Sequence, residues 1–134
     1  MSQENIDFIA ENVYANFQSG NIDGVMAVIA DDVEWNHHGP RDQVPFSGSY
    51  RGKAGAGEQL STFVGSTETE KFDVQGMYAD ADKVFVLIQE GCKVKATGKS
   101  YEILVAHIWT LRDGEIVQFD ELYDSCAVAA ACRA

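Results

Sequence analysis

A histidine and an aspartate, His107 and Asp120, lie on either side of the turn signal Asp113-Gly114. The segments that carry them, residues 103–111 and 115–123, are rich in β-branched and aromatic residues. Asp-Gly between two such segments is among the strongest short-range signals for a β-hairpin. The sequence therefore predicts two antiparallel strands, with an imidazole on one and a carboxylate on the other.

The pairing of these two side chains depends on the hairpin register. If Asp113-Gly114 is a two-residue loop, counting back from the turn pairs His107 with Asp120. Directly opposed side chains in an antiparallel pair have Cβ atoms roughly 5 Å apart, so the two groups can form a hydrogen bond. A three-residue loop would instead place Phe119 opposite His107.

An opposed imidazole and carboxylate suit proton transfer next to a carbonyl group. That chemistry needs a base near the carbon and a hydrogen-bond donor near the oxygen, both in a pocket that excludes water. We expect Asp120 to act as the acid/base and His107 as its partner. Burial raises the pKa of such a carboxylate, whereas an adjacent imidazolium lowers it. The alternative is that the pair only satisfies two polar groups inside a sheet.

A second candidate base is His37, which stands two residues after Trp35. Alternate residues of a strand share a face, so His37 and Trp35 are expected on the same side, and His38 on the other. Trp35 and Trp109 are expected either to line a pocket or to pack in the core.

Four further residues are candidate ligand contacts. Phe46 and Tyr50 fall in a turn-rich loop, residues 36–50, that would form the rim of a pocket. Tyr14 lies beside the apolar stripe of the first helix, so its hydroxyl either reaches the cavity or stays in the core or at the surface. Asp124 follows the last strand; like Asp120, it either contacts a ligand or merely solvates a strand face.

The composition limits the classes of function. A chain of 134 residues with 46% hydrophobic content predicts one domain, and a formal charge of −11 disfavours nucleic acid and anionic membranes as partners. Three cysteines without zinc-site spacing predict reduced, buried thiols. The polar start and the lack of a long apolar segment predict a cytoplasmic, soluble protein.

No spacing typical of a metal site or a phosphate-binding loop is present. His37 and His38 are adjacent, so their side chains would diverge in a strand, and the glycines of residues 52–57 do not fit a phosphate loop. Chemistry without a cofactor or metal is the simplest expectation.

The periodicity changes once along the chain. Helical spacing covers residues 6–20, a short segment from Ile22 to Ile29, and residues 55–64. A short strand at residues 33–35 precedes the loop, and four longer strands are predicted at residues 70–78, 83–95, 99–111 and 115–123. Helices followed by strands predict an α+β fold with helices on one face of a curled antiparallel sheet. Residues 125–132 are expected as a frayed helix or an extra edge contact.

The order of these elements, with the segments 30–35, 45–52 and 108–116 and the following Asp124, resembles the SnoaL-like branch of the NTF2-like superfamily. This branch is related to polyketide cyclases and ketosteroid isomerases. The resemblance covers almost the whole chain. It implies a cone, in which a strongly bent antiparallel sheet wraps around three N-terminal helices and leaves a deep pocket at its open end. The fold hosts cyclases, isomerases and non-catalytic binding proteins.

Carried over to this chain, the resemblance implies the same pair of residues. Asp120 matches the acid/base aspartate of the polyketide cyclases, and His107 matches the neighbouring histidine. Relative to ketosteroid isomerases, His37 stands at the position of the proton-shuttling aspartate, and His107 at that of the oxyanion-binding aspartic acid. The tyrosine of those isomerases is missing, because Val13 occupies the matching position.

We therefore expect a homodimer that associates through the sheet face opposite the pocket. Its ligand is expected to be a small, hydrophobic carbonyl compound. The expected activity is cofactor-independent acid/base catalysis, either an aldol-type cyclisation or an isomerisation. The alternative is a protein of the same fold that binds such a ligand without turnover.

Overall fold

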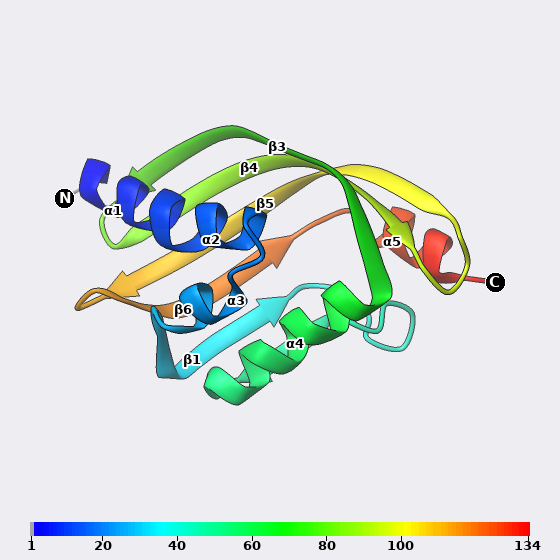
Figure 1. The fold of residues 1–134 in the computed structure, drawn as a ribbon, viewed down its shortest axis with the longest axis horizontal. Coiled ribbons are helices and arrows are strands. Elements are labelled where there is room, and N and C mark those ends of the chain that lie inside the picture. Colours follow the sequence, from blue (N-terminus) through cyan, green and yellow to red (C-terminus); the bar gives the residue numbers. More distant parts are fainter. Residues whose placement is uncertain (1) are drawn as a thin grey trace.

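The structure is a computed structural model that describes residues 2–134, and it consists of a strongly curved sheet with helices packed against its concave face (Figure 1). The helical elements are α1 (Ser2–Ile9), the π-helical turn η1 (Ala10–Tyr14), α2 (Ala15–Gln18), α3 (Ile22–Met26), α4 (Gly52–Ser66) and α5 (Ser125–Cys132). The strands are β1 (Ile29–His37), β2 (Gly48–Arg51), β3 (Thr67–Asp80), β4 (Lys83–Val94), β5 (Ser100–Arg112) and β6 (Glu115–Leu122). This is the predicted α+β class.

The six strands form one sheet in the order β2-β1-β6-β5-β4-β3. Every neighbouring pair is antiparallel except β1 and β6, which run parallel. The expected curved antiparallel sheet therefore includes one parallel pair. Alternation along a strand predicts which side chains share a face, but it does not predict which strands become neighbours.

The helix boundaries differ from the sequence pattern mainly at their ends. The first helix runs through α1, η1 and α2 and stops before Gly20, whose φ of +77° provides the expected left-handed termination. The second helix ends at Met26, and Ile29 already begins β1. The third helix starts at Gly52, three residues earlier than residue 55, the expected start, because the φ of +73° at Gly52 turns the chain directly out of β2.

The C-terminal segment, for which the sequence allowed two structures, is a helix. The side chain of Asp124 accepts a hydrogen bond from the backbone N–H of Ala127 and caps α5. This helix contacts β5 at the end of the molecule away from the chain start (Figure 1). Asp124 is thereby placed as a structural residue of the helix start.

The core lies between the helices and the concave face of the sheet. Along β4, residues 84, 86 and 88 are buried while Phe85 and Leu87 remain partly exposed, as the period of two requires. The same alternation on β5 leaves Leu104 exposed between Ile103 and Val105. The outer face of the sheet therefore carries exposed apolar side chains.

The three cysteines are unpaired and differ in exposure. Cys92 is buried, Cys132 is partly buried and Cys126 is exposed, so the expectation of buried thiols was wrong for Cys126. None of the helices within residues 2–134 is long and apolar enough to span a membrane.

Candidate functional site

A pocket opens between the N-terminal helices, α4 and the inner face of the sheet. Its empty volume is about 560 Å³, including the opening. Fifteen residues line it: Val13, Tyr14, Phe17, Val25, Trp35, His37, Gln59, Leu60, Phe63, Phe72, Glu90, His107, Trp109, Phe119 and Glu121. The wall is mostly aromatic and aliphatic, as in sites for small organic molecules, and its few polar groups come from the sheet and helices.

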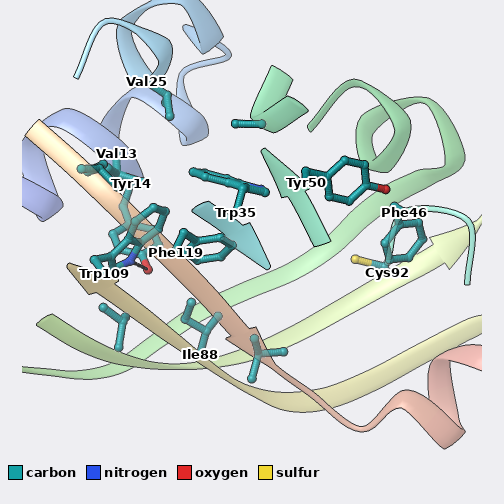
Figure 2. Close-up of a cluster of buried hydrophobic side chains, with 14 of the residues drawn as sticks. Val13, Tyr14, Val25, Trp35, Phe46, Tyr50, Ile88, Cys92, Trp109 and Phe119 are labelled. Atoms are coloured by element: carbon teal, nitrogen blue, oxygen red, sulfur yellow. Dashed lines mark hydrogen bonds between the residues drawn. The ribbon is translucent and has the colours of Figure 1, made fainter. Parts of the chain in front are cut away.

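Aromatic rings stack along one side of the pocket. The ring centroid of Phe119 lies 4.2 Å from that of Trp109 and 4.4 Å from that of Trp35. Figure 2 shows these three side chains gathered with Tyr14, whereas Phe46 and Tyr50 lie at the other side of the cluster. The indole N–H of Trp35 donates to Oε1 of Gln59 on α4, which fixes the orientation of that ring. The pocket thus has a rigid, apolar wall.

The polar centre of the pocket is a carboxylate held between two imidazoles. Oε2 of Glu121 lies 2.9 Å from Nε2 of His37, and Oε1 lies 3.0 Å from Nε2 of His107. The three residues come from β6, β1 and β5, so adjacent strands of the sheet bring them together. Burial alone would raise the pKa of Glu121, but the facing His37 and His107 outweigh it and hold that pKa well below its usual range.

The hydrogen bonds of Tyr14 define the tautomer of His107. The indole N–H of Trp109 donates to the Tyr14 hydroxyl oxygen at 2.9 Å, so Tyr14 uses its own hydrogen toward Nδ1 of His107, 2.7 Å away. His107 then carries its hydrogen on Nε2 and donates to Glu121. Burial raises the pKa of Tyr14 well above its usual value, so this hydroxyl remains a proton donor.

A similar argument fixes the hydrogens of His37. The Ser47 hydroxyl donates its only hydrogen to the backbone carbonyl of His37, 2.9 Å away. Its oxygen therefore accepts from Nδ1 of His37 at 3.0 Å and from the Tyr123 hydroxyl at 2.6 Å. Nδ1 of His37 therefore carries a hydrogen, and one further proton lies between Nε2 of His37 and Glu121. With that proton on Nε2 the pair is an imidazolium and a carboxylate; with it on Glu121 the pair is a neutral imidazole and a carboxylic acid.

A second carboxyl group, Glu90 on β4, lies in the same pocket and is only 6% exposed. Burial and the charge of Glu121 together raise the pKa of Glu90 to about 8, although a hydrogen bond with Cys92 opposes the shift. The pKa values of Glu90 and Glu121 are thus shifted in opposite directions, and in many active sites such a difference separates the acid from the base.

The predicted pairing of His107 with Asp120 was wrong by one residue. The turn is as expected, with positive φ at both Asp113 and Gly114 and with Leu111 opposite Ile116. The register then shifts, so that Thr110 faces Gln118 and His107 faces Glu121. One extra residue on β6, Val117, forms a bulge there and turns every later side chain to the opposite face.

Asp120 consequently lies outside the pocket wall. Its carboxylate accepts hydrogen bonds from His38, Asn36 and Gln118. Burial raises its pKa, but these three side chains lower it more, and the net direction is downward. His38 points away from the pocket, as predicted, and its side chain is 50% exposed.

Three other predicted contacts also lie outside the pocket wall. Phe46 is buried against the ring of His37 and therefore lies behind the polar centre. Tyr50 donates its hydroxyl hydrogen to the Ser47 carbonyl, and its ring lies beneath the Arg41 guanidinium. Asp124, as described above, caps α5.

Val13 stands at the position of the isomerase tyrosine, as expected, but the candidate contact Tyr14 lines the pocket beside it. Val13 does occupy the inward position expected from helical spacing, but the π-helical turn η1 widens the helix by one residue. Both Val13 and Tyr14 are therefore buried and line the pocket. Tyr14 therefore supplies the hydroxyl group that Val13 lacks.

The remaining candidates, His37, Trp35, His107, Trp109 and Tyr14, do line the pocket. The predicted shared face of Trp35 and His37 is confirmed by the burial of both. Sequence reasoning missed the two carboxyls. A signal for Glu90 existed, because Glu90 interrupts the alternating inward set of residues 84, 86, 88, 92 and 94 on β4. Glu121 shares a strand face with Phe119, but only the correct register shows that this face meets His107.

Within residues 2–134, no group of three or more histidine, cysteine, aspartate and glutamate side chains has an arrangement that could hold a metal ion.

Comparisons with known proteins identify the family. The sequence model of a family described as SnoaL-like domain matches residues 10–119. An NTF2-like protein from Burkholderia xenovorans LB400 superposes with a TM-score of 0.86 at 26% identity, covering 99% of this chain and 98% of that chain. A search of curated proteins finds no match.

Two less similar structures share the fold. TerC, co-crystallised with polyporic acid, has a TM-score of 0.81 at 24% identity and covers 97% of this chain and 98% of its own. A protein with a ketosteroid isomerase-like fold from Catenulispora acidiphila DSM 44928, in complex with trimethylamine, has a TM-score of 0.75 at 16% identity. That match covers 92% of this chain and 91% of the other.

Proposed function

This chain is a member of the SnoaL-like domain family, and we propose that it is a cofactor-independent acid/base catalyst acting on a small, largely apolar carbonyl compound. The proposed reactions are an aldol-type cyclisation or an isomerisation. The observation that carries the proposal is the carboxyl group of Glu121, which lies between two imidazoles in a mostly apolar pocket.

The exposure of the three polar groups favours Glu121 as the group that receives the proton. Its side chain is 13% exposed, against 3% for His37 and 10% for His107, so Glu121 is the most accessible member of the centre. A carboxylate has about four lone-pair positions, and the two histidines use two of them. A lone pair therefore remains for a C–H proton of a bound substrate.

The lowered pKa of Glu121 restricts the substrates, because a carboxylate that holds protons weakly is a weak base. We therefore propose substrates whose C–H group is activated by a carbonyl and a second electron-withdrawing or conjugating neighbour. In the step itself the C–H bond breaks, the proton moves to Glu121 and the electron pair moves to the carbonyl oxygen. This produces an enolate.

We propose that the Tyr14 hydroxyl stabilises the enolate oxygen. Trp109 fixes its oxygen, and burial keeps it protonated, so Tyr14 can redirect its hydrogen from His107 to a bound carbonyl. Return of the proton from Glu121 to another carbon gives an isomerisation. Attack of the enolate carbon on a second carbonyl, with the proton passing to the new alkoxide, gives an aldol-type cyclisation.

Deuterium uptake by 2-tetralone in D₂O, followed by ¹H NMR, tests this proposal. The C1–H of this ketone is activated by both a carbonyl and an aromatic ring. We expect the wild type to accelerate exchange over buffer, Glu121→Gln to lose the acceleration by about 100-fold or more, and Asp120→Asn to retain it within about threefold. Asp120 is the matched control because it is the neighbouring carboxylate on the opposite strand face.

The second candidate function is binding without turnover. It is favoured by one observation: within the described residues, no buried polar side-chain atom lacks a hydrogen-bond partner, so the site is satisfied without a substrate. Exchange at the buffer rate by a wild type that nevertheless binds 2-tetralone would support this function and reject catalysis of this kind.

A further inference from the structure

Glu90 is the one charged or titratable group of the pocket that the mechanism above does not use. Its side chain comes from β4, opposite Phe72 of β3 and Ile103 of β5, and it faces the cavity with 6% exposure. In the described part of the chain, no lysine, arginine or histidine pairs with it, and its hydrogen-bond partner is the Cys92 side chain. Burying a carboxyl in this way is costly unless the group is neutral or a ligand supplies a partner.

The surroundings determine the form that Glu90 takes. The pocket wall contains Glu121 but no lysine or arginine, and the two histidines are both committed to Glu121. Two carboxylates cannot both remain ionised in one apolar cavity, so the one without cationic partners retains its proton. A neutral carboxylic acid has an O–H that can donate a hydrogen bond to an oxygen acceptor.

We propose that Glu90 is a ligand-binding residue that donates a hydrogen bond to an uncharged oxygen of the ligand and makes the pocket selective for neutral aromatic ketones over charged analogues. This inference deepens the proposed function, since it concerns the same pocket and names the substrate class. An anionic ligand would meet two carboxyl groups. A cationic ligand would lose its hydration shell, and Glu90 would have to release its proton to solvent before it could pair with the cation.

The two tryptophans of the chain provide a specific readout of binding. Trp35 and Trp109 are the only tryptophans in the sequence, and both line the pocket. Their indole N–H peaks in a ¹H–¹⁵N NMR spectrum, assigned with Trp→Phe variants, report ligand binding without any turnover. The probes are three naphthalenes of similar size: neutral 2-acetylnaphthalene, anionic 2-naphthoate and cationic 2-naphthylmethylammonium.

At about pH 7 we expect 2-acetylnaphthalene to bind at least tenfold more tightly than either charged probe. Glu90→Leu, which removes the donor, is expected to weaken its binding about tenfold, the effect of one hydrogen bond in a buried site. Glu90→Gln retains an N–H donor of similar shape and is expected to bind within about threefold of the wild type. Glu102→Gln, at an exposed position of the adjacent strand β5, is the charge-matched control and is expected to bind as the wild type does.

Several results would overturn the inference. Tightest binding of the ammonium probe, lost in Glu90→Gln, would mean that Glu90 acts as a carboxylate for cations. Tightest binding of 2-naphthoate, unchanged binding in Glu90→Leu, or no indole shift with any probe would each reject the assignment. Failure of deuterium exchange with the expected indole shifts intact would reject the proposed catalysis but leave this inference standing.

Discussion

Replacing Glu121 by glutamine removes the charge at the centre of the pocket while preserving the shape of the side chain. His107 donates its Nε2–H to one oxygen of Glu121, and a single proton lies between the other oxygen and Nε2 of His37. The amide oxygen can still accept from His107, but the NH₂ group can pair with Nε2 of His37 only once that ring has lost its Nε2 hydrogen, so the charge of the pair is gone. Losing the charge-assisted hydrogen bonds of a buried carboxylate costs roughly 1.5–3 kcal/mol.

The expected loss is measurable in a chain of this size. A domain of 134 residues has an unfolding entropy of roughly 0.28 kcal/mol per kelvin, so the loss lowers Tm by about 5–11 °C. Urea unfolding followed by circular dichroism gives the free energy directly, and an unchanged m-value shows that only native-state stability has moved. Asp120→Asn is the control, with an expected loss of less than about 1 kcal/mol because its partner His38 is half exposed.

The pH dependence of this difference has a defined sign. The pKa of Glu121 is depressed in the folded protein, so its stabilising contribution is complete above the unfolded value of about 4.5 and is lost as pH falls toward the folded value. The difference between wild type and Glu121→Gln should therefore be constant from about pH 5 to neutral and narrow in stronger acid. Equal stability of Glu121→Gln and Asp120→Asn at neutral pH would refute the reasoning.

Three further predictions concern other residues. Tyr14→Phe removes the hydroxyl between Trp109 and His107, so urea unfolding should show that the free energy of unfolding falls by about 1–2 kcal/mol. Deuterium exchange of 2-tetralone should also slow. No change in either measurement would contradict the assigned hydrogen bonds. The pKa of Glu90 in the folded protein is about 8. Relative to Glu90→Gln, its stabilising effect should be complete below about pH 4.5 and should decrease by a few kcal/mol as pH rises through 8, because one unit of pKa difference corresponds to about 1.4 kcal/mol. A flat difference over that range in urea titrations would show that Glu90 is not neutral. We also predict a homodimer that associates through the outer sheet face, where Leu104 is 56% exposed. Light scattering should give the mass of a dimer for the wild type and of a monomer for Leu104→Glu. A monomeric wild type would reject this prediction.

The sequence predicted the fold class and the strands that carry His107 and Asp120, because the period of two and the turn signals are local. The Asp113-Gly114 turn and the pairing of Leu111 with Ile116 were obtained by counting alone. The bulge at Val117 was not, since a bulge is selected by the packing of β6 between β1 and β5 and leaves no distinct residue signature.

The same kind of error occurred in the first helix. Helical spacing of 3.6 residues places Val13 inward, and the π-helical turn places Tyr14 inward as well. In both elements a single extra residue changed which side chain enters the pocket. The family resemblance could not correct this, because it transfers positions along an alignment and not local changes of register.

The carboxyl of Glu90 was missed for a different reason. The alternation of residues 84, 86 and 88 places it inward, but an acidic residue inside an apolar pattern was not treated as a candidate for the site. Within a strand, a buried carboxyl without a cationic partner is itself an informative feature.

The most direct test of the central claim is a crystal structure of the protein with bound 2-tetralone. The account predicts the ketone oxygen within about 3 Å of the Tyr14 hydroxyl and the C1 carbon within about 3.5 Å of a Glu121 carboxylate oxygen. A ketone bound in the pocket with its oxygen directed away from Tyr14 and its C1 carbon out of reach of Glu121 would contradict it.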